Sequence, residues 1–267
     1  MEAKLIQEKL PVWRTAWAAV RSPFEQWSDF VRLATIPFLI MLAAGIVSAL
    51  FAWMLGDSTN SALRGIRGLF ALIGGLAGIV AYTSLHVAWI RLLVLGGKDP
   101  RTQLAFAFGW LETRFLLIPI GLGLALFSPA IVMMVISVAA ASSVVKALAI
   151  PLGIVTGALA SWAMVRFALL APAIAVERFA SLRAVWIPTE GFCWRIVGIF
   201  ALAVFPISLI AGIFGGIAKA SHSEFLIRVF AWGVMMAIQT ATIGITAAAA
   251  AMIYRALIPP EPASAAA

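Results

Sequence analysis

Charge is scarce in this sequence. Only 11% of its 267 residues are charged, whereas 63% are hydrophobic and the mean hydropathy is +1.06. A soluble globular chain is nearer half apolar and a quarter charged. The shortage of charge excludes a water-soluble globular protein, because so many apolar side chains need lipid to face.

Residues that build covalent and metal sites are also few. The single cysteine, Cys193, excludes a disulfide within the chain. Two histidines and one cysteine, widely separated, do not have the spacing of a usual metal site. No glycine-rich phosphate loop, nucleophile elbow or metalloprotease helix is present. We therefore expect no catalytic residue, no cofactor, no metal and no enzymatic activity.

Carboxylates are missing from every long apolar run. Proton-coupled pumps and many ion-coupled transporters place a carboxylate at membrane depth, because protonation there neutralises a costly charge. Its absence argues against those classes. The eleven acidic residues are Glu2, Glu8, Glu25, Asp29, Asp57, Asp99, Glu112, Glu177, Glu190, Glu224 and Glu261.

Six apolar runs are each long enough to cross about 30 Å of hydrocarbon as a helix. They cover residues 33–55, 68–90, 115–137, 147–165, 196–218 and 232–254. We predict an all-α integral membrane protein. Its expected parts are an amphipathic interfacial segment over residues 1–32, a six-helix transmembrane domain over 33–255 and a short flexible tail over 256–267.

Basic residues are distributed unevenly between the two sides of these spans. Fourteen of the 19 lysines and arginines lie in the N-terminal segment, the loops after the second and fourth spans, and the tail. The other loops hold five. Short basic loops stay in the cytoplasm, so we predict that both ends are cytoplasmic. The net charge of +8 indicates contact with anionic headgroups rather than nucleic acid, since the arginines flank apolar spans.

Similar residues recur along the chain at a nearly fixed interval. Arg32, Arg114 and Arg195 each open an odd-numbered span, at separations of 82 and 81 residues. Asp99 and Ser181 precede the second and third of these arginines at positions typical of helix N-caps. The recurrence predicts three helical hairpins, each preceded by a cytoplasmic amphipathic helix.

The first of these amphipathic helices has two opposed stripes. Apolar residues that include Trp13 and Trp17 recur at spacings of three and four, and Arg14 and Arg21 lie on the opposite stripe. We expect this helix to lie in the headgroup plane. The alternative is that the tryptophan face packs on a partner protein in a membrane complex.

Arginines also close the even-numbered spans. Arg91, Arg166 and Arg255 follow similar small, large and branched residues. We predict that they contact lipid headgroups, and a pocket for an anionic headgroup between them is one hypothesis. For Arg166 there is an alternative, burial with a bound anion, because the apolar run continues past it to Val176.

A few polar residues fall within the spans. His86 is a candidate proton relay or ligand, and Gln239, Thr242 and Thr246 share one helical face that could line a solute path. We favour hydrogen bonds to neighbouring helices for all of them. The spacing of Gly74–Gly78 is typical of close helix approach.

One set of segments resembles a known family. Residues 166–178, 181–186 and Trp194-Arg195, together with residues 88–91 and Tyr254-Arg255, resemble a group of uncharacterised bacterial polytopic membrane proteins. These are related to the membrane domain attached to some glycerophosphoryl diester phosphodiesterases. The resemblance implies a bacterial inner-membrane protein. We expect no phosphodiesterase activity, because these residues hold no soluble catalytic domain.

Three functions are compatible with these features. The favoured hypothesis is a non-enzymatic inner-membrane protein that organises lipids or partner proteins, in envelope maintenance or complex assembly. The alternative is a small-solute channel or carrier, which would need a continuous polar cavity along the last span. A membrane-embedded lipid enzyme ranks third, because Glu112, Glu177 or Glu190 would have to converge on His86.

Overall fold

The fold was examined in a computed structural model, which describes residues 10–55, 61–97, 99–103, 106–139, 143–220 and 225–258. Residues 1–9 of the predicted amphipathic segment and 259–267 of the predicted tail lie outside the described residues. The described residues are almost entirely helical and contain no strand. The predicted all-α class is therefore confirmed.

Six helices are long and apolar enough to cross a membrane, as predicted. They are α3 (Trp27–Leu55), α4 (Ser61–Leu95), α6 (Trp110–Ala139), α7 (Ser143–Arg166), α10 (Cys193–Ala220) and α11 (Phe225–Leu257). Each predicted span lies inside one of these helices. The helices are longer than the spans because intrahelical hydrogen bonding continues beyond the apolar run.

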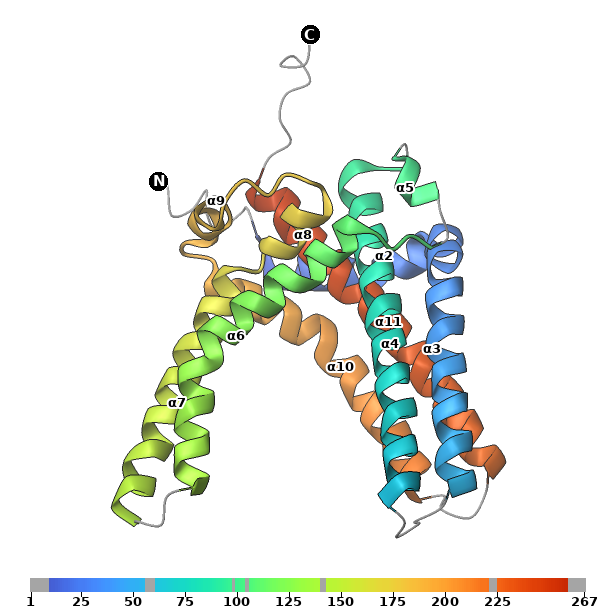
Figure 1. The fold of residues 1–267 in the computed structure, drawn as a ribbon. Helices are drawn as coiled ribbons and strands as arrows, with labels where there is room; N and C mark the ends of the chain where they lie inside the picture. Colours follow the sequence, from blue (N-terminus) through green and yellow to red (C-terminus); the bar gives the residue numbers. More distant parts are fainter. Residues whose placement is uncertain are drawn as a thin grey trace, which may run out of the picture.

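Consecutive spanning helices pack as pairs. α3 packs chiefly on α4, α6 on α7, and α10 on α11, which gives three hairpins. The three pairs are not equivalent (Figure 1): α6 and α7 lean away from α3, α4 and α11. α11 is the most buried of the six spans, whereas α6 has no buried residue beyond its first two turns. The α6–α7 hairpin therefore forms an arm joined to the other four helices near one end.

Short helices precede each hairpin, all at the end of the bundle where α4 and α11 finish (Figure 1). They are α2 (Val12–Glu25) before the first, α5 (Pro100–Gln103) before the second, and α8 (Leu170–Ala175), α9 (Leu182–Trp186) and the 3-10 turn η1 (Ile187–Thr189) before the third. The side chain of Ser181 accepts a hydrogen bond from the Ala184 N–H, so its predicted role as an N-cap is confirmed.

Helix α2 has a third face that its two predicted stripes did not reveal. Ala16, Ala19 and Ser22 are buried where α2 packs across α10 and α11. Trp13 and Trp17 point outward, with exposed fractions of 69% and 50%. Small residues thus bring α2 close to the bundle and leave the tryptophan face uncovered.

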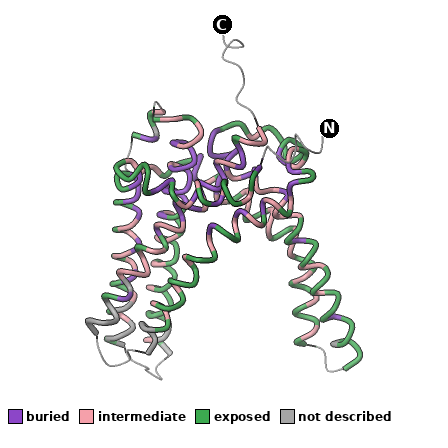
Figure 2. Tube along the Cα trace, turned by 180° about the vertical axis from the view of Figure 1, so that it is seen from behind, coloured by how far each residue is buried: buried purple, intermediate pink, exposed green. Residues whose placement is uncertain are grey.

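Burial is concentrated at the same end of the molecule (Figure 2). The largest fully buried side chains include Trp89 and Ile90 of α4, Leu170 of α8, and Ile245 and Ile253 of α11. The opposite ends of the spanning helices are mostly exposed. Burial is therefore densest at one end of the bundle, and the spanning helices are mostly exposed away from that end.

Phe30 of α3 lies against Gly244 where α3 crosses α11. The Phe30 ring also meets Trp89 of α4 edge-on, at 5.1 Å between ring centroids. A Cβ atom on Gly244 would lie only 2.9 Å from Phe30 Cζ, and closer still to its Cε2. Gly244 is therefore the position at which the Phe30 ring can lie directly on the backbone of α11.

Candidate functional site

A pocket of about 640 Å³ lies between the first hairpin, the arm and the last helix. It is lined by residues 41–48 of α3, 71–82 of α4, 116–120 of α6 and 236–243 of α11. Each of these segments belongs to a membrane-spanning helix. The pocket is open rather than enclosed, and it therefore opens at the depth of the hydrocarbon.

Glycines on α4 make the space. A Cβ atom on Gly75 or Gly78 would meet no other residue within 4 Å. Gly74 behaves differently, because its Cβ would lie 2.9 Å from Ser48 Oγ on α3. The predicted close approach of helices is thus found at Gly74, whereas Gly78 leaves room for something else.

The lining is apolar apart from three side chains, those of Ser48, Tyr82 and Gln239. Gln239 lies mid-span on α11, and its amide forms no hydrogen bond with any described residue. The predicted hydrogen bond from Gln239 to a neighbouring helix is not found among the described residues. Gln239 is exposed in the structure, so its amide is accessible to a group that enters the pocket.

The threonines on α11 do not bond neighbouring helices either. Thr242 Oγ1 donates to the carbonyl oxygen of Ile238 at 2.8 Å, and Thr246 Oγ1 donates to that of Thr242 at 2.9 Å. Both hydroxyls are satisfied within their own helix, as is usual where such a residue lies mid-helix. Neither residue lines the pocket, so the predicted polar stripe is reduced to Gln239.

His86 lies behind the pocket wall. Its ring packs between Tyr82 at 5.2 Å and Phe115 of α6 at 5.4 Å, centroid to centroid. Its Nδ1 is buried and has no hydrogen-bond partner among the described residues. The contacts that the structure shows for its ring are therefore aromatic, and the predicted hydrogen bond to a neighbouring helix is not seen at Nδ1. His86 thereby joins α4 to the arm beside the pocket.

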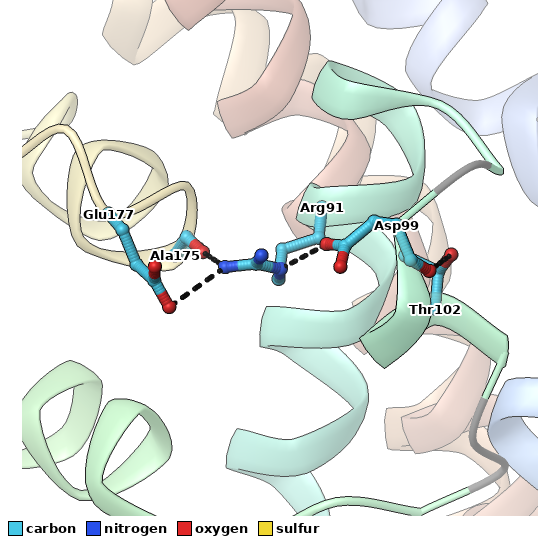
Figure 3. A network of polar contacts seen from close by, with 5 residues as sticks. All are labelled: Arg91, Asp99, Thr102, Ala175 and Glu177. Carbon is cyan, nitrogen blue, oxygen red and sulfur yellow. Dashed lines mark hydrogen bonds and ion pairs between the residues drawn. The ribbon is translucent and has the colours of Figure 1, made fainter.

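Arg91 is the centre of a polar network (Figure 3). Its Nε contacts Asp99 Oδ2 at 2.5 Å, and its Nη1 donates to the carbonyl oxygen of Ala175 at 2.7 Å. The same Nη1 lies 3.4 Å from Glu177 Oε1. Arg91 is only 7% exposed, so it is a buried structural residue rather than the free headgroup contact that we predicted.

The network of Arg91 holds the arm in place. The arm is joined to the rest of the chain by two connections, residues 96–109 before α6 and residues 167–192 after α7. Arg91 binds Asp99 in the first connection and Ala175 in the second. One side chain of α4 therefore fixes both connections of the arm.

The other two predicted headgroup arginines differ from Arg91 and from each other. Arg166 is buried between Trp162 and Trp186. Arg255 is exposed and donates to the carbonyl oxygen of Leu93 at 3.3 Å. The three arginines thus have different surroundings, and a headgroup pocket between them stays a prediction.

The three acids proposed for a lipid enzyme lie in different surroundings. Glu177 contacts Arg91, and Glu190 is exposed after η1. Glu112 is buried, and its Oε2 accepts a hydrogen bond from the Gly109 N–H at 2.8 Å. Sequence reasoning missed this buried carboxylate, although a residue three positions after an N-cap glycine is the place for such a bond.

Three comparisons were made with known proteins. No protein-family model, no curated protein and no solved structure matches the chain.

Proposed function

We propose that the protein is a non-enzymatic multi-pass protein of the bacterial inner membrane that holds a membrane lipid in the pocket between α3, α4, α6 and α11. Through this binding it organises lipids in the envelope. The observation that carries the proposal is an open, largely apolar space of about 640 Å³ at hydrocarbon depth. Acyl chains are the apolar molecules available at that depth.

Gln239 supports a lipid that has a polar group near its chains. Gln239 lines the pocket, and its amide forms no hydrogen bond with another described residue. An ester group of a lipid supplies a hydrogen-bond acceptor, and a hydroxyl group supplies both an acceptor and a donor. Interhelical hydrogen bonds in membranes contribute about 0.6 kcal/mol on average, so this contact would adjust selectivity rather than supply most of the affinity.

The same pocket counts against a channel for polar solutes. A solute path needs polar groups along its length, whereas the lining has only three polar side chains. Thr242 and Thr246, the other candidates for such a path, bond their own helix. Lipid binding is therefore the function that the lining favours.

The proposed orientation places both chain ends in the cytoplasm. Thirteen of the 19 basic residues belong to the segments that include α2, α5, α8 and α9, and a fourteenth, Arg255, lies in the last turn of α11. These helices share one end of the bundle (Figure 1). Basic segments remain cytoplasmic, so we assign the densely packed end to the cytoplasmic surface, with the short helices, amphipathic α2 among them, in the headgroup layer.

Filling the pocket tests the proposal. Gly78→Leu should expel the lipid, because its Cβ atom would meet no other residue within 4 Å and its side chain would occupy space in the pocket. Gly68→Leu is the matched control on the same helix, since its Cβ also meets nothing within 4 Å and it does not line the pocket. Both variants are purified in mild detergent, and the lipid retained per protein is measured by mass spectrometry.

We expect the wild type and Gly68→Leu to retain lipid alike, and Gly78→Leu to lose most of it. Equal retention in all three proteins would refute the pocket as the lipid site.

A further inference from the structure

Arg166, the last residue of α7, is buried in an aromatic cluster. Its guanidinium carbon lies 4.6 Å from the centroid of the Trp186 ring and 5.8 Å from that of Trp162. The two rings meet edge-on at 5.6 Å. Thr189 Oγ1 donates to the Arg166 carbonyl oxygen at 2.9 Å and to that of Trp186 at 2.7 Å. Trp186 is thereby held against the end of α7.

The positive charge of Arg166 has no negative partner in the described part of the chain. Its side chain forms no ion pair or hydrogen bond there, and its Nε is buried and unpaired. Glu177, the acid nearest in sequence, contacts Arg91 instead, and Glu190, the next acid along the chain, is exposed. Cation–π contacts stabilise a desolvated charge by about 2 kcal/mol. The free-energy cost of burying an unpaired charge is considerably larger.

The N-terminus of α10 adjoins this arginine. Thr189, whose hydroxyl donates to the Arg166 carbonyl oxygen, accepts on its own carbonyl oxygen a hydrogen bond from the N–H of Phe192, the residue before α10 begins. The Phe192 carbonyl oxygen accepts from the N–H groups of Arg195 and Ile196. The N–H groups of Cys193 and Trp194 precede these and have no intrahelical acceptor. Unpaired N–H groups and the helix dipole both favour an anion at this point.

The surroundings place this cluster at the level of lipid headgroups. Trp194 is 84% exposed, and exposed tryptophans are enriched at membrane surfaces. The cluster lies on α7, η1 and α10, and it shares no residue with the pocket between α3, α4, α6 and α11.

We propose that Arg166, its two tryptophans and the N-terminus of α10 form a binding site for a phosphate group. The arginine fork supplies charge-assisted hydrogen bonds to phosphate oxygens, and the tryptophans fix its plane. A phosphate monoester on a lipid and inorganic phosphate share this chemistry. The site goes beyond the proposed lipid pocket and can be tested apart from it.

The test compares two lipids that differ only in the phosphate. The full chain in detergent is titrated with dioleoyl phosphatidic acid, with dioleoylglycerol and with inorganic phosphate, and binding is followed by native mass spectrometry and thermal unfolding. The free energy of one charge-assisted hydrogen bond corresponds to about a tenfold increase in binding affinity. We expect the wild type to prefer phosphatidic acid over dioleoylglycerol by about tenfold or more, and Arg166→Gln to abolish this preference.

Arg255→Gln is the matched control, because Arg255 is an exposed arginine at the end of another even-numbered span. It should keep the preference. Arg166→Lys retains the charge without the planar fork and should bind with intermediate affinity. If Arg166→Gln does not fold, the wild type still decides the question, because a bound ligand raises the unfolding temperature.

Each outcome decides for or against the site. Stabilisation by phosphatidic acid alone supports a lipid headgroup as the source, whereas equal stabilisation by inorganic phosphate supports a free anion. Equal binding of phosphatidic acid and dioleoylglycerol overturns the proposal. So does a phosphate preference that persists in Arg166→Gln, or that falls equally in Arg255→Gln.

Discussion

Arg91→Gln should lower the free energy of unfolding by about 3–5 kcal/mol, the loss typical of breaking a buried ion pair by removing one partner. The substitution leaves the Asp99 carboxylate, whose side chain is only 9% exposed, without its arginine. It also leaves the carbonyl oxygen of Ala175 without its donor. The measurement is thermal or denaturant unfolding of the purified protein in one detergent.

The structure supplies two controls for this loss. Arg255→Gln removes an exposed arginine with one long hydrogen bond to the chain, and it should cost less than about 1 kcal/mol. Arg91→Gln combined with Asp99→Asn removes both charges together, so it should be more stable than the sum of the two single losses. If Arg91→Gln costs no more than Arg255→Gln, Arg91 does not hold the arm.

Gly244→Ala should cost about 1–3 kcal/mol, the range expected for overpacking in a well-filled core. The added methyl group would collide with the Phe30 ring, which is held in turn against Trp89. Gly233→Ala on the same helix is the control, because its Cβ meets nothing within 4 Å. It should be neutral or slightly stabilising, since alanine has the higher helix propensity.

A second substitution tests the cause of the Gly244 effect. Phe30→Leu shortens the side chain that the new methyl group meets, so it should recover part of the loss in the double variant. The free energy of unfolding of the two single variants and the double variant gives the coupling directly. Strictly additive losses would mean that the Phe30–Gly244 contact does not set the crossing of α3 and α11.

The spans were predictable because a membrane helix depends on local composition. In lipid the backbone must satisfy its own hydrogen bonds, so an apolar run of sufficient length has few alternatives to a helix. All six predicted runs lie within observed helices. The tilt of the arm was not predictable, because it depends on contacts such as Arg91 with Ala175, which are 84 residues apart.

The arginines show where local patterns stop being informative. Arg91, Arg166 and Arg255 occupy matching positions at the ends of even-numbered spans, and we predicted headgroup contact for all three, with burial as the alternative for Arg166. Their surroundings differ because their partners come from distant loops: an aspartate for Arg91, tryptophans for Arg166, and solvent or headgroups for Arg255. Repeated sequence thus predicted the positions of these residues but not their contacts.

The pocket could not be predicted for a related reason. Glycines four residues apart indicate close packing, and Gly74 follows that rule against Ser48. Gly78 borders open space in the pocket instead, and this difference between two similar glycines is not recorded in any local pattern. Gln239 was recognised as unusual from the sequence, whereas its lack of a partner required the positions of α3, α4 and α6.

The most direct test of the lipid pocket is photolabelling in a bilayer. A phospholipid with a diazirine on its acyl chain is reconstituted with the full chain and irradiated, and the labelled peptides are mapped by mass spectrometry. The account predicts labels concentrated on residues 71–82 and 236–243, and their loss in Gly78→Leu. Labelling that simply follows exposure, with Leu124 of α6 and Val155 of α7 modified as heavily as the pocket, would contradict it.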